Sequence, residues 1–148
     1  MNNLESDRYL QKGRTLLSFA SAELEHSEED VVNYLVCHNT RKAISNLLRS
    51  YLVTQGQADE EVPVHLLMDQ CCAADGRFTA IDLTPLECQC YTVGQNDCYC
   101  YDLEHVKECV ELGWKIESLV GDLKRLDLMK AAAKHRVVSR SPLADGFL

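Results

Sequence analysis

The chain has 148 residues, of which 46% are hydrophobic and 26% are charged. That length suits one domain with a real core, and the composition excludes a disordered chain. The sequence has no apolar run near the length of a membrane span, and residues 1–30 are too charged for a signal peptide. We therefore expect a cytoplasmic protein without membrane contact, in which the eight cysteines are thiols, metal ligands or redox centres rather than a disulfide framework.

The net charge of −8 is distributed unevenly along the chain. Residues 124–148 hold six basic and two acidic groups, a net +4, so residues 1–123 carry −12. The acidic body disfavours general binding to phosphate backbones, and the basic end is the exception. We expect a helical body over residues 1–126 and a basic, partly disordered tail over residues 127–148.

Helical periodicity runs through most of the chain, beginning with residues 5–25. There, side chains within roughly 80° on a helical wheel form one stripe: Leu10, Gly13, Leu17, Ala20 and Leu24. Ser27, followed by three acidic residues, predicts the N-cap of a second helix that stops at Gly56. Its expected buried face comprises Val36, Thr40, Ala43, Leu47 and Tyr51.

A polar connection over residues 57–63 leads to a short helix over residues 64–74. Thr84, followed by Pro85, Leu86 and Glu87, predicts a second short helix with Thr84 as its N-cap. The last long helix begins near Asp102 and runs to about Leu126 or beyond. Its apolar stripe comprises Cys109, Gly113, Ile116, Val120 and Leu123. With no strand alternation, this order predicts an all-α, up-and-down helical bundle of three long helices plus two short ones.

The segment CQCYTVGQNDCYC, residues 88–100, places four cysteines in thirteen positions. On a strand, Cys88 and Cys90 would point the same way and could share a metal ion. The capping pattern at Thr84 instead predicts a helix, where residues i and i+2 lie about 200° apart. The Cys-x-x-Cys spacing typical of zinc sites is absent, so structural thiols are the preferred interpretation. A metal or redox site stays open as the alternative for Cys88, Cys90, Cys98 and Cys100. The remaining cysteines are expected to be packing residues: Cys37, Cys71, Cys72 and Cys109.

The second helix also has a polar face, opposite Leu47. Its side chains lie within about 60° of one another, with Arg41 beside them: His38, Lys42, Ser45 and Arg49. The simplest interpretation is a solvated face. The functional alternative is an anion or nucleotide site, or a contact with a partner protein.

The sequence contains no catalytic set that we can identify. His65, at the start of the first short helix, is interpreted as a capping or hydrogen-bonding residue, because a lone histidine carries no mechanism without a nucleophile or a base partner. No Gly-rich phosphate loop, Ser-His-Asp set or paired carboxylates with a substrate cleft are found. We therefore predict no catalytic residue and no cofactor.

Two stretches of the chain carry a family resemblance: NYLVCHNTRKAISNLLRSYLVTQG, residues 33–56, and VPVHLLMDQC, residues 62–71. The second contains the pattern Pro-x-His-x-Leu at Pro63, His65 and Leu67. Together with the final helix after a tyrosine-rich segment, they resemble the HEPN (higher eukaryotes and prokaryotes nucleotide-binding) domain family over roughly residues 5–125. The order and spacing of the elements carry this resemblance more than any single motif.

The chain departs from the family's pattern at two places. Arg41-Lys42 stands where many members have Glu-Lys, and residues 98–102 read Cys-Tyr-Cys-Tyr-Asp where many have Arg-Tyr-Pro. Ribonuclease members use an Arg-x4–6-His motif, and no arginine stands at that spacing before any of the five histidines. This absence favours a non-catalytic member of the family.

The resemblance implies a domain that binds a nucleotide, RNA or a partner protein. Many relatives work beside a separately encoded nucleotidyltransferase, in a toxin–antitoxin-like pair, or as homodimers. The apolar residues of the last helix also spread over well beyond 100°, which predicts burial against more than one neighbour and an isologous dimer: Val106, Cys109, Leu112, Ile116, Leu119 and Val120. One alternative is a metal-independent RNase or nucleotide-processing enzyme with an atypical site around His38, Lys42 and His65. The other is a thiol-based redox or metal sensor built on residues 88–100.

Overall fold

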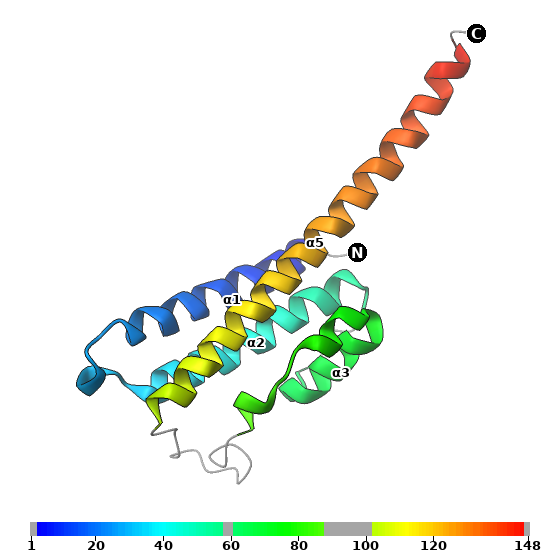
Figure 1. The fold of residues 1–148 in the computed structure, drawn as a ribbon. Coiled ribbons are helices and arrows are strands. Elements are labelled where there is room, and N and C mark those ends of the chain that lie inside the picture. Colours follow the sequence, from blue (N-terminus) through cyan, green and yellow to red (C-terminus); the bar gives the residue numbers. More distant parts are fainter. Residues whose placement is uncertain (1–2, 58–60, 88–101, 147–148) are drawn as a thin grey trace.

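The computed structural model describes residues 3–57, 61–87 and 102–146, with the backbone alone for residues 135–146. The described residues form an all-α helical bundle without strands, as predicted (Figure 1). The α-helices of the described residues are α1 (Asn3–Leu24), α2 (Asn33–Thr54), α3 (Val64–Ala74) and α5 (Leu103–Gly146). The 3₁₀ turns among these residues are η1 (Glu28–Asp30), η2 (Gly76–Ala80) and η3 (Thr84–Leu86).

Helix α1 runs antiparallel to both α2 and α5, so α2 and α5 run in the same direction (Figure 1). Contacts of the start of α1 fall near the end of α2 and far along α5: Ser6 with Ser50, and Asp7 with Lys124. Further along α1, Arg14 contacts Glu117, which is earlier in α5. Helix α3 and turn η2 pack on α2, where the Cys71 thiol donates to the Leu48 carbonyl and the ring of Phe78 contacts that of Tyr51.

The core is formed by the apolar faces that periodicity predicts. Every residue of the predicted buried face of α2 is buried, as are all five of the predicted stripe of α5. In α1, Leu10, Gly13, Leu17 and Ala20 are buried and Leu24 is half-buried. A second, smaller cluster closes the end of the bundle where α2 begins: Ala20, Val36, Val106 and Val110.

Two glycines let the long helices approach closely. A Cβ on Gly13 of α1 would lie 2.8 Å from the Leu47 side chain of α2 and 3.1 Å from the Ala43 carbonyl oxygen. A Cβ on Gly113 of α5 would lie 2.5 Å from the Leu17 side chain of α1. Both contacts are shorter than van der Waals packing permits, so these positions require a residue without a side chain.

The predicted start of the second helix at Ser27 is wrong. Ser27 precedes the separate turn η1, and its hydroxyl donates to the Asp30 carboxylate at 2.7 Å instead of capping a long helix. After η1 the chain is extended at Val31, which packs against the small cluster at this end of the bundle. Helix α2 therefore begins only at Asn33, and tertiary packing overrides the local capping signal.

The second short helix, predicted from Thr84, is only the three-residue turn η3. Thr84 is not its N-cap, because both its N–H and its hydroxyl donate to the Asp82 carboxylate. The Pro85 carbonyl accepts hydrogen bonds from His105, at 2.7 Å, and from the Cys109 thiol, at 3.2 Å. Side chains of α5 thus take the carbonyl that a continuing helix would use.

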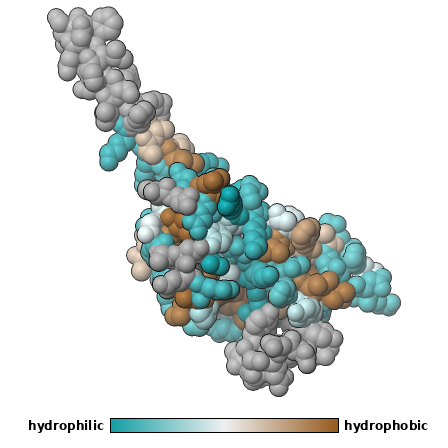
Figure 2. Space-filling model, turned by 180° about the vertical axis from the view of Figure 1, so that it is seen from behind, coloured by the Kyte–Doolittle hydropathy of each residue, from teal (hydrophilic) through white to brown (hydrophobic). Residues whose placement is uncertain are grey.

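Helix α5 continues to Gly146, and its last part projects away from the other helices (Figure 1). We call residues 127–146 the arm. The start of α1 lies beside its base, and Figure 2 shows apolar side chains there. No described helix combines the length and the hydropathy that crossing a bilayer requires.

Candidate functional site

The outer face of α2 holds most of the candidate residues that the sequence indicates. Lys42 is exposed, and His38, Ser45 and Arg49 are half-buried. The His38 ring stacks on Tyr34, with centroids 5.6 Å apart and an interplanar angle of 16°. The structure therefore presents these side chains on one accessible helix face.

An aromatic ring of α1 extends this face. The guanidinium carbon of Arg49 lies 4.9 Å from the centre of the Tyr9 ring, a distance typical of a cation–π contact. Tyr9 belongs to α1 and His38 to α2, so the face extends across the boundary between these two helices. The face thus has an aromatic ring at each end, Tyr34 beside His38 and Tyr9 beside Arg49.

Arg41 and His65 lie apart from this face. The half-buried Arg41 guanidinium donates to the Leu86 carbonyl of η3, so this side chain joins α2 to the turn before α5. His65 is the second residue of α3 and is exposed. Arg41 therefore has a clear structural role, whereas His65 is accessible on a different helix.

The cysteines divide between described and undescribed parts of the chain. The candidate metal ligands Cys88, Cys90, Cys98 and Cys100 lie outside the described residues. Within the described residues, no group of three or more His, Cys, Asp and Glu side chains could hold a metal ion.

The described cysteines confirm the packing interpretation in large part. Cys37, Cys71 and Cys109 are buried, and Cys72 is half-buried. Burial raises the pKa of Cys71 to about 12, with a further contribution from Cys72. Because the thiolate is the reactive form, Cys71 is poorly suited to redox or nucleophilic chemistry.

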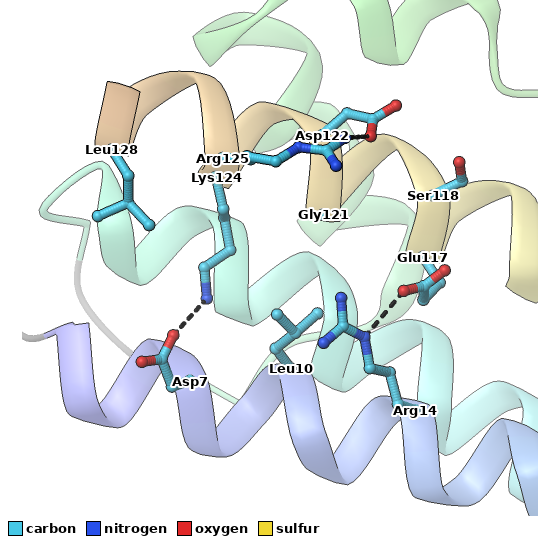
Figure 3. A pocket seen from close by; sticks show the side chains of 10 residues that line it. All are labelled: Asp7, Leu10, Arg14, Glu117, Ser118, Gly121, Asp122, Lys124, Arg125 and Leu128. Carbon is cyan, nitrogen blue, oxygen red and sulfur yellow. Dashed lines mark hydrogen bonds and ion pairs between the residues drawn. The ribbon is translucent and has the colours of Figure 1, made fainter. Parts of the chain in front are cut away.

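A pocket that the sequence did not indicate lies between α1 and α5 (Figure 3). It has a volume of about 400 Å³ and is lined by ten side chains, all labelled in Figure 3. Three cations line it, each paired with an acid: Arg14 with Glu117 at 2.8 Å, Lys124 with Asp7 at 3.1 Å, and Arg125 with Asp122. The pocket is therefore balanced in charge.

Lys124 is the most deeply buried of these cations, with 9% of its side chain exposed. Its ammonium group donates to Asp7 and, at 3.0 Å, to the Ser50 hydroxyl of α2. Ser50 in turn donates to the Ser6 carbonyl at 2.8 Å. These bonds join α1, α2 and α5 through one buried polar network.

Burial lowers the pKa of Lys124 below its ordinary value, and the neighbouring Arg14 acts in the same direction. The hydrogen bond and the charge of Asp7 oppose this shift. Since Asp7 keeps 66% of its side chain exposed, it compensates only part of the cost of burying the ammonium group.

One sequence signal could have indicated the pocket. Asp7 and Arg14 are seven residues apart on α1, as are Glu117 and Lys124 on α5, and each pair has opposite signs. Residues seven apart lie on nearly the same face of a helix, so two antiparallel helices can pair both ends. In the sequence analysis Lys124 enters only as one charge of the basic segment 124–148.

Comparisons with protein-family models, curated proteins and solved structures found no significant match to this chain. The fold class thus follows from the structure alone.

Proposed function

We propose that this protein is a non-catalytic, HEPN-like helical domain whose α2 face binds a nucleotide or a short stretch of single-stranded RNA. The α2 face comprises His38, Lys42, Ser45 and Arg49, with Tyr34 and Tyr9 at its edges. The resemblance described above supports the class of ligand, and the composition of α2 supports the position of the site.

The charge of α2 is the observation that carries this proposal. The chain holds 23 acidic residues, yet none of them lies in the 22 residues of α2. The same helix contains Arg41, Lys42 and Arg49 in addition to His38. Because residues 1–123 carry −12 even with the three cations of α2 included, a helix free of acids is where a phosphate group meets the least repulsion.

The aromatic rings favour a nucleotide over a simple anion. Single-stranded nucleic acids are bound by cations that contact phosphates and by aromatic rings on which bases stack. Tyr34 is 40% exposed beside His38, so part of this ring is accessible to a base. The acidity of the rest of the body restricts the ligand to one short enough to stay on the α2 face.

Exposed apolar residues at the start of α2 favour a second candidate, a partner protein. Val32, Tyr34 and Leu35 are 46%, 40% and 43% exposed and lie within four consecutive residues. A separately encoded nucleotidyltransferase, as implied by the HEPN resemblance, is the partner we propose in this case. Both candidate functions are compatible with a homodimer.

The proposal is tested by binding of a fluorescent ATP analogue and of a short labelled RNA to the full chain, followed by anisotropy. Lys42→Glu should weaken binding at least about fivefold, because it replaces an accessible cation by an acid. The slope of log affinity against log salt should also fall by about one for the RNA.

Lys115→Glu is the matched control, since it makes the same charge change at an exposed lysine of α5. It should leave binding nearly unchanged. Absence of binding to wild-type protein, or an equal loss in both variants, would show that the α2 face is not the site. Cleavage of the RNA that disappears in His38→Ala or His65→Ala would instead establish the RNase alternative.

A further inference from the structure

The apolar residues of α5 move to a different side of the helix at the point where it leaves the bundle. Within the body, Ile116, Val120 and Leu123 are buried against the other helices. In the arm, the corresponding side of the helix carries charged residues: Asp127, Lys130 and Lys134. The apolar residues Leu128, Met129 and Ala132 lie about 150° further round the helix, at 100° per residue. We call these three residues the arm face.

Contacts at the base of the arm show which helices lie next to its charged side and which lie next to its arm face. Gln55, at the end of α2, donates to Asp127 at 3.2 Å, and the charge of Lys130 acts on Asp75 after α3. The charged side of the arm therefore faces α2 and α3. On the other side, Leu128 lines the pocket between α1 and α5 and points towards α1 (Figure 3).

The arm face is open to solvent. Leu128 is 62% exposed, Met129 is 61% exposed, and Ala132 is exposed as well. A helix that projects from a bundle has no tertiary packing of its own, and short helices are marginal in water without it. An exposed apolar stripe on such a helix is typical of a surface that packs on a partner helix.

Charge decides which partner fits this surface. The arm carries four basic and two acidic residues, a net +2, and residues 1–126 carry −10, so the arm and the body of this same chain are complementary in charge. In a parallel pair of chains, each basic arm would lie on the other basic arm. In an antiparallel pair, each arm extends over the acidic body of the other chain, which is electrostatically favourable.

We propose that the arm face packs on the arm face of a second copy of this chain, antiparallel and around a two-fold axis. Each arm then runs along the groove between α1 and α5 of the other copy. Because the same patch serves both copies, the interface is isologous and closes as a dimer. This inference deepens the homodimer of the proposed function by naming its surface and does not require ligand binding by the α2 face.

The pocket between α1 and α5 is continuous with the arm face through Leu128, which belongs to both. Leu10 adds an apolar residue to its floor. The cations and acids that line the pocket are paired with one another, so the apolar side of an arm from the second copy packs there. The attraction between arm and body comes from the net charge of the body as a whole.

The test is the mass of the full chain in solution, measured by sedimentation and by light scattering. Wild-type protein should be a dimer at micromolar concentration. The double variant Leu128→Glu/Met129→Glu should raise the dimer Kd at least about tenfold, because it places four acids in one small interface. Both side chains are largely exposed, so the bundle should fold, and circular dichroism checks this.

Phe19→Glu, at a 60% exposed residue of α1, is the matched control and should remain dimeric. A photo-crosslinking residue at position 128 should yield dimers joined at the arm or at the α1–α5 groove. A monomeric wild type, a dimer unaffected by the double variant, or crosslinks confined to α2 would overturn the proposal. If the double variant is monomeric but still binds nucleotide, the dimer surface is established independently of the ligand site. Loss of nucleotide binding in a protein that remains dimeric would affect only the proposed function.

Discussion

Helix α5 passes through two environments, and the difference between them shows what helical periodicity can and cannot reveal. In the body, Ile116 and Val120 are fully buried, and Gly113 lets the helices approach closely. In the arm, Leu128 and Met129 are mostly exposed, although the helix continues without interruption. An apolar stripe in the sequence thus identifies a helix surface that is stabilised by burial. Only the tertiary structure shows which element, if any, buries it.

The largest expected effect contrasts the core with the base of the arm. Leu47→Ala removes a fully buried side chain that contacts Gly13, so it should lower the free energy of unfolding by about 2–5 kcal/mol. Leu126→Ala, at a 39% exposed residue, should cost less than about 1 kcal/mol. Urea denaturation measures both. Equal losses would show that the arm base is packed as tightly as the core.

Close helix contact is tested next, by two glycines of α5. Gly113→Ala should lower the free energy of unfolding by about 1–3 kcal/mol, because its Cβ would clash with the buried Leu17. A Cβ at Gly121 meets only side-chain ends, those of Arg14 at 3.3 Å and Glu117 at 3.9 Å. Gly121→Ala should therefore raise stability by about 0.5–1 kcal/mol through helix propensity. The same sign for both variants, measured by thermal unfolding, would contradict the close contact.

A smaller effect is expected at Lys124, where the body ends. Lys124→Met should raise the free energy of unfolding at pH 7 by up to about 1 kcal/mol, because it removes a buried ammonium group and leaves only the exposed Asp7 without its partner. Ser50 retains its bond to Ser6. A loss of several kcal/mol in denaturant titrations would show that the polar network is strongly stabilising.

The pH dependence of the same variant gives a second readout. Since burial lowers the pKa of Lys124 from 10.5, the native state releases this proton at a lower pH than the unfolded chain. Wild-type stability relative to Lys124→Met should therefore rise with pH in the window that ends near 10.5. A difference that falls with pH would mean that the pKa of Lys124 is raised.

The smallest perturbation is chemical labelling of the core thiol. With its pKa raised to about 12, Cys71 should react with N-ethylmaleimide at neutral pH only after unfolding. Mass spectrometry of peptides before and after denaturation measures this. Labelling of native Cys71 at the rate of an exposed thiol would show that the body opens locally around α3.

Much of the body was predictable because burial follows the period of the helix. The buried faces of α2 and α5, and the bounds of α3, agree with the sequence analysis. The candidate face of α2 was predicted as well, since four side chains at helical spacing must share a side. The sequence could not show that Arg41 differs from these four residues, because its hydrogen bond to the Leu86 carbonyl joins segments 45 residues apart.

The errors fall where local signals compete with distant partners. Ser27 is a residue type that favours the N-cap position, yet its hydroxyl donates to the Asp30 carboxylate. Val31 then packs on the small cluster, so α2 begins after it. Thr84 has the pattern of a capping box, yet Asp82 takes its donors and α5 takes the Pro85 carbonyl. In each case the alternative hydrogen bonds compete with those of a helix over a few residues, and tertiary contacts settle the balance.

The sequence by itself determined that this protein is helical and which faces of its helices are apolar, because both depend on spacing along one chain. Only the tertiary structure decided that α1 runs antiparallel to two parallel helices, and that Lys124 is buried with Asp7 and Ser50 as its hydrogen-bond partners. It also decided where α5 leaves the bundle and turns an apolar face to solvent. These features depend on which faces meet across long separations in sequence, and each is the outcome of many small packing and desolvation energies that no local pattern contains.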